Sequence, residues 1–473
     1  MRFGKGKTMK KVLALILTLA MALSLAACGK SADKPDKSNP NVNPEDAWKV
    51  SANEIPKGRT LVKYWSPFGS GTASKMDSFI NAFNGSQDTY FVVREYNGGY
   101  YDQIAKLMAT EQADLPALCN SSSETVGSYL HSGLIKMMQD YIDGDSEMAE
   151  RNLYGNLIST FGKDGDLIGY PVGLSLSGFW YNTAVFEKAG IDPTTLTSFD
   201  RVYEAALKIG EGGYAQYALS EEHSGIWANY AFAREGFYTT DNENGATGLP
   251  TKCLYDDNSN GFADIVTNYY TEWADLAAKG YLYPVGSSMK EELIPALAAG
   301  QLAMIVSTNS YLSQVQAAFG DSKDFGFIPM FSATDNGKQT GFCSSGNGFF
   351  IVDNGNKEAM KGAYEFVKFF TNVDNQIAWN AMTGYLPLYD DVYNSKEYQA
   401  VLAEYPYVQS VIEAMRSADN SAWYAFTATN NEYTLAGATC LEAVCNGTPV
   451  DQAIAEMCET INNAFEMYNA TNS

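Results

Sequence analysis

The stretch that decides the fold runs from Ser177 to Ile209 and reads SGFWYNTAVFEKAGIDPTTLTSFDRVYEAALKI. Its first six residues are an apolar run that ends in a polar residue, which predicts a strand. Val185–Lys188 predicts a short helix that Gly190 ends, and a turn follows at the next proline. Thr197 and Asp200 have the spacing of an N-cap and its partner at the start of a second helix. The stretch therefore predicts strand, helix, turn and helix, a unit of α/β proteins.

The same alternation precedes this stretch. Strands are predicted at Thr60–Trp65, Thr89–Tyr96 and Ala117–Cys119, with helices at Lys75–Phe83 and Tyr101–Thr110. The first strand and helix enclose Gly69-Ser70-Gly71, which resembles the start of a dinucleotide-binding fingerprint. Ser74 stands where the third glycine would allow the helix to pack closely on the strand. We therefore expect no nucleotide cofactor, and no other cofactor.

Length, composition and charge restrict the class of protein. A chain of 473 residues exceeds the size at which one core keeps growing, so two lobes are expected. Hydrophobic residues make up 45% and aromatic residues 13%, which excludes general disorder. The net charge of −23 argues against nucleic-acid binding, because phosphate recognition needs clustered Lys and Arg. With 31 Tyr and 7 Trp, the chain suits an uncharged, ring-bearing ligand better.

The N-terminus has the pattern of an exported protein. A basic segment precedes the apolar run Val12–Leu25, which is too short to span a bilayer but suits a signal peptide. Leu25-Ala26-Ala27-Cys28-Gly29 resembles a lipobox, so residues 1–27 are interpreted as a lipoprotein signal peptide and Cys28 as the lipidated residue. The alternative is an ordinary signal peptide with an incidental cysteine. Residues 28–58 are predicted to be the lipidated cysteine and a flexible tether to the membrane.

Six further cysteines lie in the body of the chain: Cys119, Cys253, Cys343, Cys440, Cys445 and Cys458. Disulfides are allowed outside the cytoplasm, but six cysteines in a body of this size are not the density of a disulfide scaffold. We interpret them as small buried apolar residues, and the sequence leaves their redox state open.

Four segments carry a family resemblance. Tyr181–Pro193 with the capped helix after it resembles the extracellular solute-binding proteins of ABC importers, in the carbohydrate-binding family 1. Ala298–Met304, Gly346–Val352, and Lys357–Phe370 with Trp379–Pro387 resemble further segments of that family, in the same order. The last segment is similar to the branch of glycerol-3-phosphate-binding and sugar-binding proteins. The likeness spans about residues 59–465.

The resemblance implies an architecture and a mechanism. The fold is expected to be α/β, two-lobed and periplasmic-binding-protein-like, of type II like maltose-binding protein, with a hinge and an interlobe cleft. Lobe 1 would hold residues 59–171 and 341–390, and lobe 2 residues 175–335 and 400–473. Crossings between the lobes are expected near Tyr170–Leu174, Thr340–Gly346 and Leu388–Tyr398. The protein would be an extracytoplasmic, membrane-anchored monomer that closes on a carbohydrate and delivers it to ABC permease subunits.

Candidate ligand-binding residues follow partly from the resemblance and partly from chemistry. A sugar site combines aromatic faces with short polar side chains and amides. The candidates are Tyr100, Ser123, Glu124, Ser175, Trp227, Thr308, Asn309, Gly346, Tyr385 and Trp423. Trp65 is a further possible stacking platform, whereas Trp180 and Trp379 are expected in the core. No catalytic residue and no metal ligand is assigned.

Three other functions are weighed against this one. The glycerol-3-phosphate branch holds its phosphate with an Arg, but Ala425–Tyr433 contains no Arg or Lys, which favours a neutral mono- or oligosaccharide. A glycoside-active enzyme is the less favoured alternative, because the chain has only 2 His and no motif singles out a carboxylate pair. Asp256–Gly261 resembles part of a calcium loop, but Thr267 stands at the position of its bidentate Glu, so we interpret it as a surface turn.

Overall fold

A computed structural model describes residues 55–222, 226–339, 344–417 and 427–472. The predicted signal peptide, Cys28, most of the tether and Trp423 lie outside these ranges. Within them, no helix is both long enough and apolar enough to cross a membrane.

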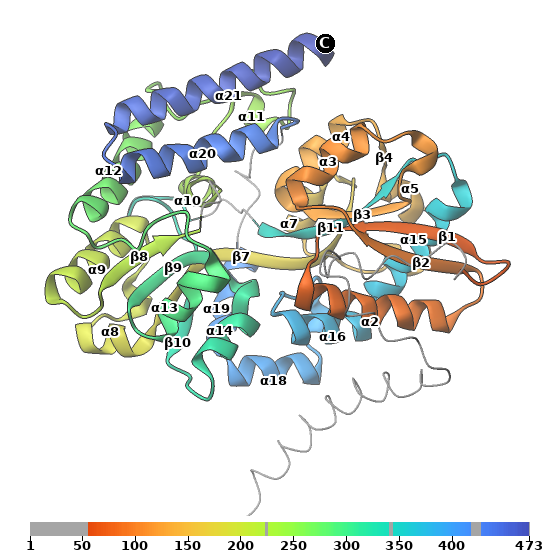
Figure 1. Ribbon diagram of the computed structural model, residues 1–473, viewed down its shortest axis with the longest axis horizontal. Helices are drawn as coiled ribbons and strands as arrows, with labels where there is room; N and C mark the ends of the chain where they lie inside the picture. Colours follow the sequence, from red (N-terminus) through yellow and green to blue (C-terminus); the bar gives the residue numbers. More distant parts are fainter. Residues whose placement is uncertain (1–54, 223–225, 340–343, 418–426, 473) are drawn as a thin grey trace, which may run out of the picture.

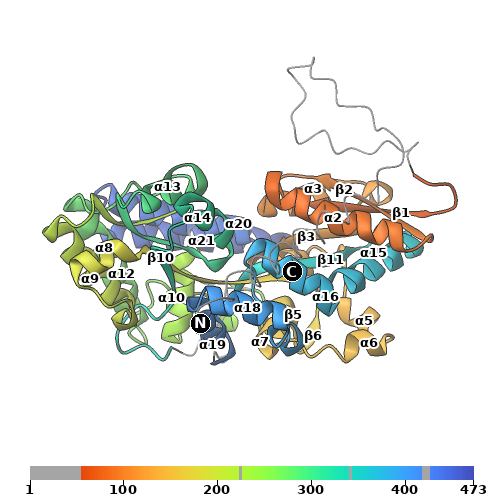
Figure 2. The same cartoon turned by 90° about the horizontal axis from the view of Figure 1, so that it is seen from below.

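The elements form two groups that lie side by side and are joined through the middle by a long strand, β7 (Tyr170–Asn182) (Figure 1; Figure 2). Lobe 1 contains β1 (Thr60–Ser66), α2 (Ser70–Ser86), β2 (Tyr90–Tyr96), α3 (Tyr100–Met108), β3 (Leu118–Ser122), α4 (Val126–His131), β4 (Ile135–Lys136), α5 (Met138–Ile142), α6 (Ser146–Ala149), α7 (Gly155–Phe161), β5 (Gly162–Lys163), β6 (Asp166–Leu167), β11 (Ser344–Val352), α15 (Lys357–Phe370) and α16 (Val373–Thr383).

Lobe 2 contains α8 (Thr183–Ala189), α9 (Phe199–Gly212), β8 (Tyr217–Glu221), α10 (Trp227–Glu235), α11 (Asp241–Asn244), α12 (Phe262–Ala278), α13 (Ile294–Ala298), β9 (Leu302–Thr308), α14 (Leu312–Phe319), β10 (Phe325–Pro329), α20 (Asn430–Cys445) and α21 (Val450–Asn472). Three helices follow α16 along the chain: α17 (Asp390–Tyr393), α18 (Lys396–Glu404) and α19 (Tyr407–Ser417). Helices α20 and α21 lie along one side of lobe 2 and end at the C-terminus (Figure 1).

A mixed sheet passes through both lobes in the order β2-β1-β3-β11-β7-β9-β8, with β10 also paired to β7. β1 is parallel to β2 and β3, and β8 is parallel to β9, whereas β11 and β9 run antiparallel to β7. The two parallel parts each need helical crossovers, which α2, α3 and the helices after β8 supply. The sheet therefore has one α/β half in each lobe.

β7 changes partners halfway along its length. Its first half, Tyr170–Leu176, pairs with β11, and its second half, Ser177–Asn182, pairs with β9 and β10. Leu386 also reaches this strand, because its N–H donates to the carbonyl oxygen of Leu174 at 2.7 Å. Three segments far apart in the sequence thus lie side by side where the two lobes meet.

The strands and helices predicted around the deciding stretch are confirmed, with one correction. Gly190 ends α8 in the left-handed conformation, φ 61°, as a C-cap glycine does. The capping prediction for α9 is wrong by one residue. Ser198, not Thr197, is the N-cap, and its hydroxyl accepts from the N–H of Arg201 at 3.3 Å. Asp200 instead accepts from the N–H of Asp335 at 3.3 Å, because the segment after β10 packs beside this helix end.

Buried apolar side chains form two clusters. One surrounds β1, β3 and β11 under α2, α15 and α16, and continues through the middle of the molecule to α14 and α19. The other fills the space between β8, β9, α9, α12, α20 and α21. Trp180 and Trp379 are fully buried, so the prediction that they belong to the core is confirmed. The first cluster therefore extends from lobe 1 into lobe 2, and the two lobes share apolar packing where they meet.

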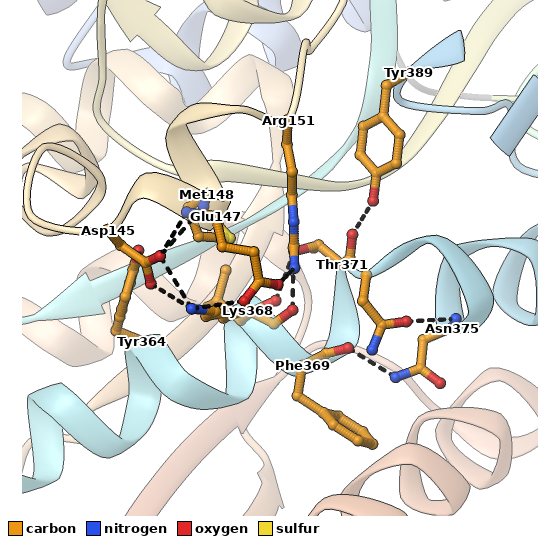
Figure 3. A network of polar contacts seen from close by, with 12 residues as sticks. Asp145, Glu147, Met148, Arg151, Tyr364, Lys368, Phe369, Thr371, Asn375 and Tyr389 are labelled. Atoms are coloured by element: carbon orange, nitrogen blue, oxygen red, sulfur yellow. Dashed lines mark hydrogen bonds and ion pairs between the residues drawn. The ribbon is translucent and has the colours of Figure 1, made fainter. Parts of the chain in front are cut away.

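A polar network stiffens lobe 1 away from the lobe boundary (Figure 3). The ammonium of Lys368 on α15 contacts Asp145 at 2.7 Å and Glu147 at 2.9 Å. Arg151 contacts Glu147 at 2.7 Å and donates to the hydroxyl of Thr371 at 2.8 Å. The network joins the segment around α6 to α15, and its charges are paired within it (Figure 3). We interpret it as a structural cluster.

Candidate ligand-binding site

A cavity of about 370 Å³ lies between the lobes, with walls from both. Lobe 1 contributes the loop after β1, the start of α3, the end of β3, the start of β11 and the end of α16. Lobe 2 contributes Glu222, Ile226 and Trp227, the end of β9 and the first residues after it. A space of this size, reached by strand ends and helix starts, is typical of a small-molecule site.

The structure brings most of the sequence-predicted residues to this cavity. Its wall includes Tyr100, Glu124, Ser175, Trp227, Thr308, Gly346 and Tyr385. Ser123 and Asn309 are buried behind the wall and are not among its lining residues. Trp423 lies outside the described residues. The placement agrees with the proposed roles of seven candidates, and their contact with a ligand stays a prediction.

Asn309 has a structural position beside the cavity. Its side-chain oxygen accepts from the N–H of Leu176 at 2.7 Å, and its amide donates to the carbonyl oxygen of Gly384 at 2.9 Å. These bonds tie the end of β9 to β7 and to the segment after α16. Both ends of the side chain are engaged, so Asn309 holds the segments that carry Thr308 and Tyr385 in place.

Tyr385 sits at the end of a chain of polar groups. The amide of Asn347 donates to the Tyr385 hydroxyl at 2.8 Å, and the side-chain oxygen of Asn347 accepts from Asn120 at 3.1 Å. The Tyr385 ring stacks on Trp379, with centroids 6.0 Å apart and an angle of 16°. Burial, which outweighs the bond from Asn347, raises the pKa of Tyr385 to about 12. The hydroxyl therefore stays neutral at pH 7.

Gly346 needs to be glycine because of the neighbouring strand. Its φ is 151°, and a Cβ atom there would collide with the carbonyl oxygen of Gly173 on β7. Gly346 is also one of the ligand-binding candidates from the sequence. Gly346 does line the cavity, and the crossing of β7 and β11 also requires it.

Two buried donors on the wall have no partner among the described residues. They are the hydroxyl of Ser122 and the indole N–H of Trp227. Ser122 is 7% exposed and Trp227 is 4% exposed. Leaving a buried donor unpaired costs about 1–3 kcal/mol. A bound molecule with oxygen acceptors would pair with these donors and remove that free-energy cost. Trp227 is the first residue of α10.

Trp65 does not contribute to the site. Its side chain is buried on β1, and its indole N–H donates to the carboxylate of Glu95 at 3.1 Å. The hypothesis that Trp65 is a stacking platform is therefore wrong for this cavity, because the indole packs within the lobe 1 core. Aromatic faces are instead supplied by Phe68 and Tyr311, which sequence reasoning missed, beside Tyr100, Trp227 and Tyr385.

The comparisons with known proteins agree with this geometry. Residues 78–404 match the family described as bacterial extracellular solute-binding protein. The chain belongs to that family. Its members are solute-binding proteins and not enzymes, and they work outside the cytoplasm.

Curated relatives and solved structures place the chain near one branch of the family. The sn-glycerol-3-phosphate-binding periplasmic proteins of Shigella flexneri and of Escherichia coli K12 are 22% identical over 73% of this chain and 78% of theirs. The structure of UgpB from Mycobacterium tuberculosis in complex with glycerophosphocholine has a TM-score of 0.69 at 16% identity, covering 87% of this chain and 100% of that one. The expected fold, α/β and like maltose-binding protein, is confirmed.

A further similar structure comes from a sugar-binding protein. The cyclic alpha-maltosyl-1,6-maltose binding protein from Arthrobacter globiformis has a TM-score of 0.66 at 20% identity. The alignment covers 86% of this chain and 99% of that one. These identities establish the shared fold, and the ligand has to be argued from the cavity itself.

Three of the four Lys and Glu side chains on the cavity wall of this solute-binding protein were also missed by sequence reasoning, which named only Glu124. Among the described residues, the Lys and Glu side chains on the wall are Lys75, Lys290, Glu124 and Glu222. Lys75 donates to the carbonyl oxygen of Met382, and burial lowers its pKa. Burial raises the pKa of Glu222, and the positive charge of Lys290 opposes that rise. The wall thus carries as many Glu as Lys side chains, and its residue composition gives no surplus of positive charge for a dianion.

The segment that resembled a calcium loop is a turn that leads into α12. Asp257 accepts from the N–H of Ser259 at 2.9 Å, and Asn260 accepts from the N–H of Phe262 at 3.1 Å. Such bonds from an Asp or Asn side chain to the N–H two residues on are those of an Asx turn. In the described ranges, no three His, Cys, Asp or Glu side chains are grouped as metal ligands.

Proposed function

We propose that this solute-binding protein captures a neutral mono- or oligosaccharide in the interlobe cavity. The unpaired donors of Ser122 and Trp227 carry the proposal, because sugar hydroxyl and ring oxygens are acceptors for both. The aromatic faces beside them suit the C–H faces of a sugar ring. The balanced wall charges favour a neutral ligand over a phosphate.

Ligand capture is proposed to work by lobe movement. Segments from both lobes line the cavity, and they connect through β7, β11 and the segment around Leu386. A ligand held by both walls stabilises the closed arrangement more than the open one. The lobe boundaries given above, at residues 59–171 with 341–390 and 175–335 with 400–473, are part of this proposal.

The ligand class is tested by thermal unfolding and calorimetric titration against a panel. The panel holds glucose, maltose, maltotriose, a cyclic tetrasaccharide, glycerol 3-phosphate and glycerophosphocholine. A ligand at a hundred times its dissociation constant adds about 2.7 kcal/mol of stability. We expect a rise in Tm with a neutral sugar. A rise in Tm with the phosphate compounds alone would contradict the neutral-sugar proposal. It would indicate that Lys75 and Lys290 bind the anionic group of the ligand.

Two substitutions separate the proposed contacts from general stability. Trp227→Phe keeps an aromatic face and removes the N–H, and Ser122→Ala removes the hydroxyl. We expect each to weaken sugar affinity by about tenfold, the value of one hydrogen bond of ~1.4 kcal/mol. Ser177→Ala is the matched control, because its hydroxyl is also buried without a described partner but does not line the cavity. Equal affinities in all four proteins would contradict the assignment of the site.

Glycerol 3-phosphate or another polar solute is the second candidate function. Lys75 and Lys290 on the wall favour it, since a phosphate needs cations within reach. The curated relatives named above bind sn-glycerol 3-phosphate. The panel distinguishes the two candidates directly.

We also propose that Cys28 carries a lipid anchor and that the protein delivers its solute to ABC permease subunits as a monomer. The lipobox-like segment supports the anchor, and the family supports an extracytoplasmic site of action. Metabolic labelling with an alkynyl fatty acid tests the anchor. We expect the full chain to be labelled and membrane-bound, and Cys28→Ala to be neither. Unlabelled wild-type protein in the medium would instead indicate an ordinary signal peptide.

A further inference from the structure

Two cysteines that are far apart in the sequence meet inside lobe 2. The sulfur of Cys253, in the segment after α11, lies 2.9 Å from the sulfur of Cys458, in the middle of α21. They are separated by 205 positions in the chain. Cys253 is 0% exposed and Cys458 is 2% exposed, so the pair is sealed from solvent.

Contacts on both sides of the pair hold the two segments against each other. The N–H of Cys253 donates to the side-chain oxygen of Asn462 at 2.7 Å, one turn along α21 from Cys458. Asn469 donates to the carbonyl oxygen of Pro250 at 3.0 Å. Cys253 also forms a β-bridge with Thr240. Contacts that do not involve the sulfurs therefore hold the two segments together at this point.

We propose that Cys253 and Cys458 form a disulfide bond in the exported protein. The chain belongs to an extracellular family, and disulfides form and persist outside the cytoplasm. The S–S bond length is about 2.05 Å, so the sulfurs have to approach by less than about 1 Å. Small side-chain rotations supply that movement without displacing either segment.

The reaction is a thiol–disulfide exchange with an extracytoplasmic oxidoreductase of the dithiol–disulfide class. One protein thiolate attacks the oxidoreductase disulfide, forming a mixed disulfide and releasing one oxidoreductase thiol. The second protein thiolate attacks the mixed disulfide, which forms the Cys253–Cys458 bond and releases the second thiol. The protein loses two protons and two electrons, and the oxidoreductase is reduced to its dithiol. In the folded protein both sulfurs are sealed from solvent and burial raises the pKa of the Cys253 thiol, so the exchange takes place before α21 docks.

The other described cysteines do not compete for this bond. Cys119 lies in lobe 1, where its thiol donates to the carbonyl oxygen of Phe350 at 3.8 Å. Cys440 and Cys445 lie on α20, and among the described cysteines only Cys253 and Cys458 have sulfurs in contact. The pairing is thus defined by the fold and not by sequence spacing.

The bond supports the wall of the ligand cavity. Tyr255, two residues after Cys253, donates to Asn229 on α10, and its hydroxyl lies 2.8 Å from that of Tyr433 on α20. Helix α10 begins with Trp227 at the cavity. The disulfide therefore joins α21 to the segment that backs this cavity helix.

Peptide mapping of the full chain tests the proposal directly. The protein is produced with its own leader in an oxidising extracytoplasmic compartment, and free thiols are alkylated with iodoacetamide before unfolding and again after denaturation. Digestion without reductant should yield a peptide that joins Cys253 to Cys458 and disappears on reduction. Alkylated Cys253 and Cys458 in the denatured sample, or a peptide that joins Cys458 to Cys440, would overturn the proposal.

Substitutions provide a second readout. We expect Cys253→Ser, Cys458→Ser and the double variant to lower Tm by the same amount, about 5 °C or more. The reason is that all three remove the same disulfide, which closes a long loop. Cys119→Ser is the matched control for loss of a buried thiol, and it should keep the joined peptide. Losses in Tm that add in the double variant would show two independent thiols and overturn the proposal. The peptide map remains decisive if a variant fails to fold.

Discussion

The carboxylate of Glu124 accepts a hydrogen bond from the hydroxyl of Tyr230, and this bond joins lobe 1 to lobe 2 at the ligand cavity. Glu124 lies in a 3-10 turn directly after β3, and Tyr230 lies on α10, one turn from Trp227. Both side chains are buried. Ser128 donates to the carbonyl oxygen of Ala428 at 3.0 Å nearby, which adds a second link between the lobes. The structure therefore represents an arrangement in which the lobes contact each other.

Tyr230→Phe removes the donor and leaves the buried Glu124 carboxylate without it. We expect the ligand-free lobes to open more and the sugar affinity to fall by about tenfold, because a bond to a charged group contributes ~1.5–3 kcal/mol. Calorimetric titration measures the affinity, and small-angle X-ray scattering of the ligand-free protein measures the opening.

Tyr203→Phe is the control for this substitution. Its hydroxyl also donates to a carboxylate, that of Asp275 at 2.7 Å, but both residues lie within lobe 2. It should change neither the affinity nor the scattering. If Tyr230→Phe behaved in the same way, the Glu124–Tyr230 bond would have no role in closure.

Gly346→Ala places a Cβ atom against the carbonyl oxygen of Gly173, at a φ of 151° that disfavours alanine. We expect a loss of about 2 kcal/mol or more in the free energy of unfolding, together with loss of ligand binding, since β7 and β11 have to separate. Denaturant unfolding gives the first quantity and titration the second. Gly71→Ala is the control, because no atom lies within 4 Å of its Cβ position on α2. A stability of Gly346→Ala equal to that of the control would refute the argument.

Glu272 makes stability depend on pH. Burial, with the negative charge of Asp200 as the next cause, raises the pKa of Glu272 from 4.5 to about 8. The folded protein binds a proton that the unfolded chain has released, so this group lowers stability as pH rises from 4.5 to about 8.

We expect Glu272→Gln to match wild type near pH 5 and to be more stable by about 2 kcal/mol at pH 9, because glutamine stays neutral. Denaturant unfolding at both pH values measures the difference. Glu459→Gln on the exposed face of α21 controls for loss of one negative charge. A constant difference between Glu272→Gln and wild type across this range would contradict the assignment.

Lys368→Met breaks the lobe 1 network of Figure 3 and should destabilise the protein by about 2 kcal/mol at pH 7. Burial opposes ionisation of Asp145, but its bonds from Lys368 and the N–H of Met148 outweigh it and hold the pKa below 3.8. This stabilisation is present above pH 3.8 and is lost as pH falls through the lowered pKa.

The gap between Lys368→Met and wild type should therefore narrow in acid, which denaturant unfolding at pH 7 and pH 3 would show. Lys361→Met is the control, since Lys361 is exposed on the same helix. A gap that stays the same at both pH values would exclude a role for the Asp145 charge.

The sequence predicted helices and strands correctly where their signal lies in neighbouring residues. The apolar spacing of Lys75–Phe83 and the Gly190 stop identified α2 and α8, because helix periodicity and a left-handed C-cap are properties of neighbouring residues. The predicted N-cap of α9 was wrong by one residue. The Asp200 carboxylate accepts a hydrogen bond from the N–H of Asp335, in a distant segment, and so does not form the predicted capping pair. The family motifs led to Tyr385 and Gly346, both of which line the cavity.

Other cavity residues carried no sequence signal. Lys290 lies in a polar run, Met289–Leu293, that looks like an ordinary exposed turn, and Ser122 is one of three consecutive serines. Trp65 and Trp227 were both possible ligand contacts from the sequence, yet one is bonded to Glu95 in the core and the other lines the cavity. Which polar or aromatic residue reaches the ligand depends on the crossing of β7 with β11 and β9.

The sequence by itself determined the α/β class, the order of elements and the family, because these depend on periodicity, caps and ordered motifs along the chain. The tertiary structure decided which groups meet: Glu124 with Tyr230, Asn347 with Tyr385, and Cys253 with Cys458. Their separations of 106, 38 and 205 positions leave no periodic trace in the sequence. Only packing of the lobes brings such distant side chains to bonding distance, since burial of apolar faces, and not local conformation, sets where they lie.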